Sequence, residues 1–145
     1  ILECLEHLNL YGDFYLPQIA DKIKNAHSSG SPTFKSGIIG NYFAQSMLPK
    51  PKLNKMKTFK DKNPLNAKLE KTVIDKSLKQ HITLLDLLDQ SRNVNLNGVK
   101  IETSISSLLK LKLGDTFQFF INHIIRHLSQ IDQILIAAQW SSFAR

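Results

Sequence analysis

A long polar connection separates the first two helical patterns of this chain and limits how its helices can be arranged. The connection, "SSGSPTFKSGIIGNYFAQSMLPKPKLNKMKTFKDKNPL" at residues 28–65, is rich in Ser, Pro, Gly and Lys, and predicts one short helix near Ile38–Met47. Neighbouring antiparallel helices need only a few linking residues, whereas a long crossover lets the next helix run parallel to the previous one. The sequence therefore predicts parallel helices on the two sides of this connection.

The residues before the connection form the first long helical pattern. In "ILECLEHLNLYGDFYLPQIADKIKNA", residues 1–26, apolar side chains recur close to every 3.6 residues. Pro17 predicts a kink or a junction near Tyr15, because proline lacks the N–H that a helix interior uses. The pattern starts at Ile1 with no capping residue before it, so we expect further residues to precede Ile1.

Two more long helices are predicted after the connection. One runs from Asn66, a suitable capping residue, to about Arg92, and the other begins near Gly114 or Asp115 and ends near Trp140. The residues between them predict an extended linker, with a tight turn at the Asn-Gly pair 97–98 and a short turn of helix near its end. The apolar positions predicted for the first of these helices are Leu69, Val73, Leu78, Ile82, Leu85 and Leu88.

The composition is that of one soluble globular domain covering residues 1–145. Hydrophobic residues make up 42% and charged residues 21% of the 145, which excludes disordered and fibrous classes. Cys4 is the only cysteine, so the chain has no intrachain disulfide, and we expect a reducing, cytoplasmic environment. The apolar runs are short and interrupted by polar residues, so no membrane span or signal peptide is predicted.

Two histidines lie four residues apart in the last predicted helix, within "FFINHIIRHLSQIDQIL". At about 100° per residue, His123 and His127 lie along one edge of the apolar stripe that contains Phe117, Phe120 and Ile124. Leu128, Ile131 and Leu135 continue this stripe, with Ile134 near its edge. Two inward imidazoles at this spacing can share a metal ion.

The ordinary reading of an inward histidine is a hydrogen-bonded core residue. Two adjacent core histidines would need two separate sets of hydrogen-bond partners, or lowered pKa values that keep both rings neutral. One shared cation would instead provide a partner for both rings. The spacing alone supplies only two ligands and recurs on many helices. His27 sits in a polar segment, His81 lies near the edge of an apolar face, and His7 belongs to an inward stripe with Cys4 and Tyr11. His7 is therefore the best third candidate on pattern.

Four segments resemble the DinB/YfiT-like superfamily of four-helix-bundle metalloenzymes. "ECLEHL" resembles the histidine-bearing motif of that family's second helix, and "HIIRHLSQI" resembles the paired-histidine signature of its fourth helix. "LPKPKLNKMKTFKDKNP" is similar to the crossover between helices two and three, and "VKIETSISSLLKLKLGD" to the lead-in to helix four. The resemblance extends in order over nearly the whole chain.

The resemblance implies an all-α, up-down-down-up four-helix bundle whose first helix would precede Ile1. It also implies that His7, His123 and His127 form a three-histidine site for a divalent metal ion, with zinc or nickel preferred and manganese or iron possible. Family members with assigned roles are hydrolases or transferases that use low-molecular-weight thiols. We therefore expect a metal-dependent enzyme of one of these kinds, with a small-molecule substrate and a possible homodimer.

Other polar residues near the predicted site have less certain roles. Gln130 can line the pocket or orient a ligand from one turn beyond His127, or form a hydrogen bond at the bundle edge. Arg126 is expected on the far side of the helix, in an interhelical or surface ion pair. Glu3 and Glu6 flank His7 and are expected to face solvent. No general base can be identified.

Two alternative functions are also compatible with the sequence. One is a bundle that binds metal or has a structural role without catalysis. The other is nucleic-acid binding, suggested by a net charge of +7 and six lysines in the connection. These lysines are spread along the segment with only Phe59 as a nearby stacking aromatic, which favours a solvated basic loop. The six are Lys50, Lys52, Lys55, Lys57, Lys60 and Lys62.

Overall fold

The computed structural model describes residues 1–27, 30, 33–50 and 57–143, with side chains up to residue 140. It is mostly helical, and its described part has one two-stranded antiparallel sheet. All the long elements are helices, as the all-α prediction requires, and the short sheet was not predicted. The long helices are α1 (Leu2–Lys24), α3 (Thr72–Gln90) and α4 (Leu113–Phe143). The shorter elements are α2 (Ile38–Met47), η1 (Lys60–Lys62), η2 (Ser91–Asn93), β1 (Lys100–Glu102) and β2 (Lys110–Lys112).

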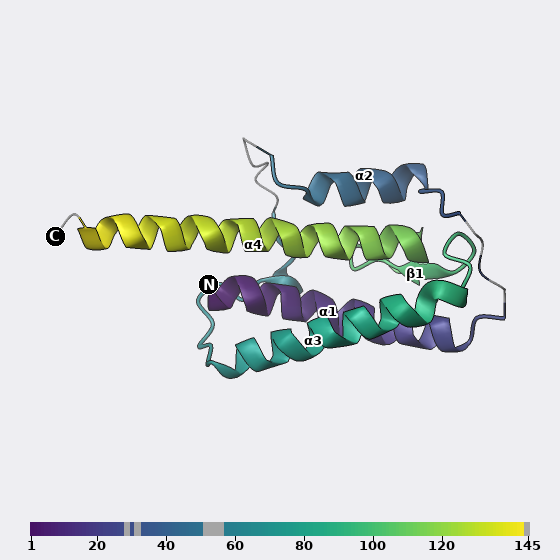
Figure 1. Ribbon diagram of the computed structural model, residues 1–145, viewed down its shortest axis with the longest axis horizontal. Coiled ribbons are helices and arrows are strands. Elements are labelled where there is room, and N and C mark those ends of the chain that lie inside the picture. The colour runs from purple at the N-terminus through teal and green to yellow at the C-terminus, as the bar shows by residue number, and fades with distance from the viewer. Residues whose placement is uncertain (28–29, 31–32, 51–56, 144–145) are drawn as a thin grey trace.

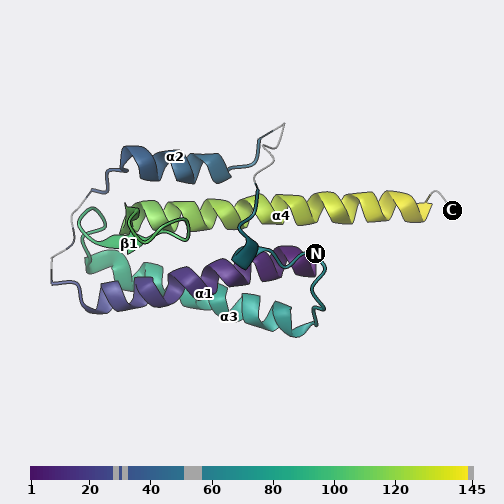
Figure 2. The same ribbon diagram turned by 180° about the vertical axis from the view of Figure 1, so that it is seen from behind.

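Helix α4 lies between α2 on one side and α1 on the other, and α3 packs along α1 (Figures 1 and 2). Helices α1 and α3 run in the same direction, and α4 runs opposite to both (Figure 1). The parallel arrangement expected from the long connection is confirmed. The short helix predicted at Ile38–Met47 is also confirmed, and it covers the outer side of α4.

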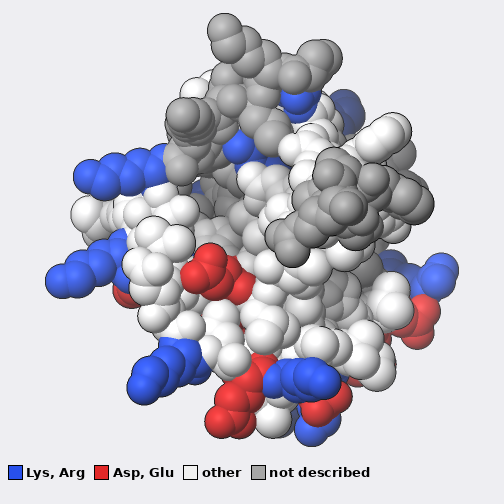
Figure 3. Space-filling model, turned by 90° about the vertical axis from the view of Figure 1, so that its left-hand side faces the viewer, with Lys and Arg blue, Asp and Glu red and all other residues white. Residues whose placement is uncertain are grey.

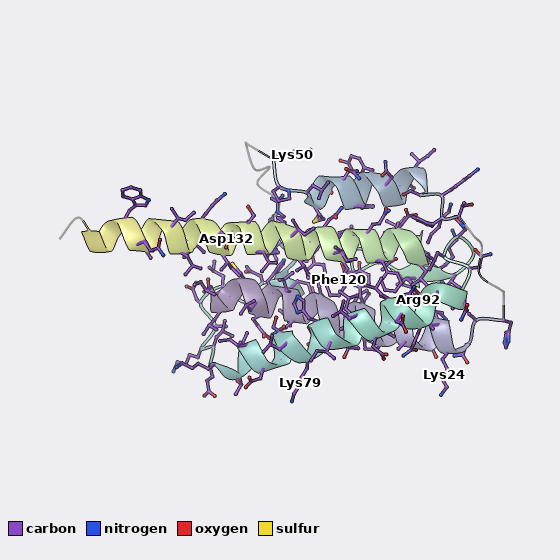
Figure 4. All side chains as sticks on the ribbon, viewed as in Figure 1. Lys24, Lys50, Lys79, Arg92, Phe120 and Asp132 are labelled. Atoms are coloured by element: carbon purple, nitrogen blue, oxygen red, sulfur yellow. The ribbon has the colours of Figure 1, made fainter. Side chains whose placement is uncertain are left out.

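The hydrophobic core fills the space where α1, α3 and α4 meet. Helix α1 contributes Tyr15 and Ile19, α3 contributes Leu84 and Leu87, and α4 contributes buried residues that include Phe120. Figure 4 shows Phe120 in the layer between α4 and α1, while Lys24 and Lys79 project away from the helices. No helix in the described part of the chain has the length and apolarity needed to cross a membrane.

The linker before α4 folds as a β-hairpin rather than ending in a turn of helix as predicted. In the hairpin, Ile101 pairs with Leu111 and both are buried, while Glu102 pairs with Lys110 and forms an ion pair with it at 3.2 Å. This alternation of inward and outward side chains has the period of a strand, which explains the outcome. The predicted turn at residues 97–98 is confirmed, since the Gly98 N–H donates to the Asn95 carbonyl at 3.1 Å.

Two predicted helix boundaries are wrong. Of the kink or junction predicted near Tyr15, the junction is wrong, because helix α1 continues through Pro17. Pro17 and Asp13 are both exposed, so water can reach the Asp13 carbonyl that proline leaves without its partner. Helix α3 begins at Thr72 rather than Asn66. Asn66 has a φ of 63°, outside helical geometry, and its N–H donates to the Glu3 carboxylate at 3.0 Å.

Several apolar positions predicted to face the core are exposed. On α3, Leu78, Ile82 and Leu85 are exposed by 59%, 67% and 67%, because α3 buries a neighbouring stripe, which includes Leu84, against α1. On α4, Leu128, Ile134 and Leu135 are also exposed, and Figure 1 shows the end of this helix extending beyond the start of α1. The periodicity identified helices correctly but misplaced parts of their buried faces.

A buried carboxylate holds α2 against α4. Asp115, in the first turn of α4, is 1% exposed, and it accepts hydrogen bonds from the Ser36 hydroxyl and, at 3.0 Å, from the Gly37 N–H. The negative charge lies at the N-terminus of α2, where the helix dipole stabilises it. Gly40 lets the two helices approach, because a Cβ at that position would overlap the carboxylate carbon of Asp115.

We predict that Gly40→Ala destabilises the protein by about 1 to 3 kcal/mol through this overlap. Glycine to alanine inside a helix normally stabilises by up to about 1 kcal/mol, so the expected sign is the reverse of the usual one. Urea denaturation measures the change, with Asn41→Ala at an exposed position of the same helix as the control. A more stable Gly40→Ala protein would contradict the prediction.

Candidate metal centre

Three histidines from the two ends of the chain meet between α1 and α4. His7 comes from the second turn of α1, and His123 and His127 come from successive turns of α4. His7 and His123 are buried, with 8% and 4% exposure, and His127 is half-buried. One ligand atom from each of the three lies within 4.8 Å of the other two. The structure thus brings together the three residues that the sequence singled out.

The ring of His7 has a defined orientation. Its Nδ1 lies 2.6 Å from the backbone carbonyl oxygen of Lys62, in η1. A carbonyl can only accept, so Nδ1 carries the proton and donates it. The Nε2 atom of a neutral His7 is therefore left with its lone pair, directed toward α4. This is the arrangement in which ligand histidines are commonly held, with the second nitrogen donating to a carbonyl.

The three Nε2 atoms converge. The Nε2 of His123 lies 3.2 Å from that of His7 and 3.0 Å from that of His127. Each such contact needs a proton between its two nitrogens, and one N–H of a neutral His123 cannot be directed at both neighbours. Two nitrogens on a tetrahedral ion, each at about 2.05 Å, are separated by about 3.3 Å. The two observed separations are close to that value, so the lone pairs of this cluster are compatible with a shared cation.

The second ring nitrogen of each α4 histidine, Nδ1, also lacks a partner among the described residues. Among the described residues, the Nδ1 atoms of His123 and His127 are buried and have no hydrogen-bond partner within normal geometry. An unsatisfied buried polar atom is costly, on the order of 1 to 3 kcal/mol. The packing of α1 against α4 therefore buries a polar cluster at a cost in folding free energy. The cluster can hold a metal ion.

Burial keeps all three imidazoles neutral. Loss of solvent lowers the pKa of His7, and its bond to the Lys62 carbonyl opposes this only in part. Burial is the main cause that places the pKa of His123 well below its usual value, and repulsion from Arg126, and from His127 and His7 when these are protonated, acts in the same direction. Burial is also the main cause that lowers the pKa of His127 to about 4, and a contact with the Gln130 side chain acts in the opposite direction. Neutral imidazoles are the form that binds metal.

A cavity of about 600 Å³ opens beside the histidines, and all three line it. Tyr11, one turn after His7, forms part of its wall, with its ring centroid 4.6 Å from that of His123 in an edge-on contact. The cavity has the size of a small-molecule site. A molecule that enters it lies beside the three histidine side chains.

The remaining histidine and acidic candidates lie elsewhere. His27 is exposed, and His81 is half-buried on α3, where its Nδ1 donates to the Ser77 carbonyl at 2.7 Å. Neither belongs to the three-histidine cluster. Glu3 is exposed as expected, and Glu6 is half-buried and accepts a hydrogen bond from Asn9.

Gln130 and Arg126 both line the cavity. Lining the cavity is one of the two positions expected for Gln130, and its side chain contacts His127. Arg126 was expected on the far side of the helix, in an interhelical or surface ion pair, and the surface alternative is wrong, because Arg126 is only 7% exposed and lines the cavity. The reason is that the hairpin and the connection after α2 add walls around α4, so a larger part of its circumference is enclosed than a two-helix contact would cover.

Some residues of the site carried no signal in the sequence. The Lys62 carbonyl is a backbone group, so no residue type predicts its role. Tyr15, Phe43 and Ser104 line the cavity from three different elements, and their proximity depends on the tertiary fold. Phe119 is the exception, since it lies one helical turn before His123 and could have been found from the spacing.

Comparison with protein-family models, with curated proteins and with solved structures finds no match for this chain.

Figure 3 shows the end of the molecule toward which α4 projects. Lys and Arg side chains project separately around this face, with Asp and Glu side chains between some of them. Of the six lysines in the connection, Lys52 and Lys55 lie outside the described residues. Lys62 forms an ion pair with Asp61 at 3.1 Å, and its ammonium lies 5.4 Å from the centre of the Phe14 ring. Part of this basic segment thus has local partners within the protein.

We predict that the metal-free protein loses stability as the pH falls from about 6.5 toward 4. The unfolded chain binds a proton at His127 near pH 6.5, whereas the folded state binds it only near pH 4, so acid favours unfolding. This difference is worth up to about 3 kcal/mol. Urea denaturation in the presence of chelator measures it.

The His127→Gln variant separates this effect from the titration of carboxylates in the same pH range. Its stability should decrease less than that of the wild type over the interval. Parallel pH profiles for the two proteins would show that His127 is protonated in the folded state, contrary to the burial argument.

Proposed function

We propose that His7, His123 and His127 bind one divalent metal ion and that the chain is a metal-dependent hydrolase or low-molecular-weight-thiol transferase. The observation that supports the metal most directly is that the Nε2 atom of His123 lies 3.2 and 3.0 Å from those of His7 and His127, with one ligand atom of each histidine within 4.8 Å of the others. A nitrogen-only ligand set suits zinc or nickel, with manganese or iron as further candidates.

The proposed chemistry follows from the position of the site. A divalent ion bound there would act as a Lewis acid on an oxygen or sulfur atom of a substrate. The protein's own residues then have separate tasks. Lys62 fixes the His7 ring, Gln130 contacts His127, and the Tyr11 ring covers His123 and limits access of water from the side of α1.

The choice between hydrolase and thiol transferase rests on the resemblance of "ECLEHL" and "HIIRHLSQI" to the DinB/YfiT-like superfamily. The parallel course of α1 and α3, with α4 running opposite, is compatible with the bundle that this resemblance implies. A non-catalytic metal-binding module is the alternative. A homodimer and a cytoplasmic location stay predictions from the sequence.

We predict that protein purified without a histidine tag binds about one equivalent of zinc or nickel. His7→Ala and His127→Ala should each lower the affinity by at least about tenfold, because each removes one of three ligands. His81→Ala, on α3, and His27→Ala are the matched controls and should bind like the wild type. Isothermal titration with elemental analysis provides the measurement, and stoichiometric metal in His127→Ala would refute the three-histidine assignment.

A second prediction concerns turnover. The metal-loaded protein should either hydrolyse an activated ester or amide, or join a small thiol such as cysteine to an electrophile such as 1-chloro-2,4-dinitrobenzene. Activity should be lost with chelator, return with the added ion, and be absent in His127→Ala. Tight metal binding without either activity across a panel of such substrates would favour the non-catalytic alternative.

A further inference from the structure

The cavity beside the three histidines carries positive charge without any acidic side chain among its described lining residues. Its cationic members are Arg126 and Lys57. Arg126 is 7% exposed and belongs to the wall, while Lys57 is exposed and belongs to the entrance. With the imidazoles neutral, the side chains around the cavity bear only positive charge. This electrostatic environment favours an anionic organic ligand.

The rest of the cavity is largely apolar and aromatic. Tyr11 and Tyr15 line it from α1, Phe43 and Met47 from α2, and Phe119 from α4. Within α1, the rings of Tyr11 and Tyr15 stack with centroids 6.3 Å apart and form one continuous wall. Such a wall binds the apolar part of a ligand by excluding water. A small inorganic anion would leave most of it without a contact.

Two polar groups of the cavity wall come from the same helix as the paired histidines. Arg126 follows His123 by three residues, so these two side chains are neighbours on α4, and both line the cavity together with His127. A guanidinium has five N–H donors in a planar fork that fits a carboxylate, phosphate or sulfonate group. Gln130 adds an amide on the same side of the cavity.

We propose that this cavity binds a small organic anion with an aromatic or aliphatic body, with its acidic group at Arg126 and its apolar part against Tyr15 and Phe43. At about 600 Å³, the cavity can enclose a molecule with one or two rings. The inference rests on the proposed function, because it takes the three histidines as the reacting end of the same cavity, and it specifies the class of substrate.

The test compares two fluorescent probes of nearly the same shape. They are 8-anilinonaphthalene-1-sulfonate and the uncharged N-phenyl-1-naphthylamine, each titrated into metal-free protein in the presence of chelator. We expect the wild type to bind the sulfonate at least about tenfold more tightly than the amine. Arg126→Gln should lower the affinity for the sulfonate by about tenfold and leave that for the amine within about twofold.

Arg92→Gln is the matched control, because Arg92 is exposed at the end of α3 and pairs with Asp89. It should leave both affinities unchanged. Equal affinity of the wild type for the two probes would overturn the proposal, as would an equal loss in Arg92→Gln. If Arg126→Gln lacks the native circular dichroism spectrum, Lys57→Gln replaces it, with about a threefold loss for the sulfonate expected. No loss in that variant would overturn the proposal too.

The His127→Ala variant separates this inference from the metal proposal. It should keep the preference for the sulfonate, since Arg126 and the aromatic wall are unchanged. A wild type that binds no metal but prefers the sulfonate would refute the proposed function alone. A wild type that binds metal but shows no preference would refute the anion site alone.

Discussion

The packing of α1 against both α3 and α4 is the contact on which the rest of the structure depends. Ile19 and Tyr15 are almost completely buried in it, and the same side of α1 continues through Tyr11 to His7. This buried side of α1, here called the seam, therefore changes from an aliphatic residue (Ile19) to aromatic residues (Tyr15 and Tyr11) and then to the imidazole of His7. Because the metal-binding candidates extend the core seam, any change that shifts α1 relative to α4 also changes the separations between the three Nε2 atoms.

The seam combines two opposing demands. Aromatic rings pack closely around His123, with the Tyr11 and Phe119 centroids 4.6 and 5.8 Å away, and this packing favours a dry, rigid core. The same packing removes water from imidazole nitrogens that lack partners, which opposes folding. Proteins commonly accept such local costs at functional sites. The surrounding apolar core supplies the stability that the cluster does not.

The sequence predicted the parts of this molecule that depend on a single segment. Helical periodicity identified the α4 histidines as neighbours on one face, and the length of the connection predicted the parallel course of α1 and α3. It could not predict what lies opposite each face. Leu78 was expected inside and is exposed, and Arg126 was expected away from the apolar stripe and is buried, because periodicity relates residues within one helix only. His7 was singled out by its stripe and the motif around it, whereas the Lys62 carbonyl had no signal.

The hydrogen bond from His7 to the Lys62 carbonyl joins the histidine cluster to a segment without secondary structure on either side of η1. A bond of this kind makes the order of that segment and the occupancy of the cluster mutually dependent, by the same factor in both directions. Residues 57–63 would then protect their backbone amides from exchange, and resist proteases, in proportion to how firmly the imidazoles are held. Amide exchange or proteolysis of this segment would then indicate the state of the histidine cluster without an activity assay.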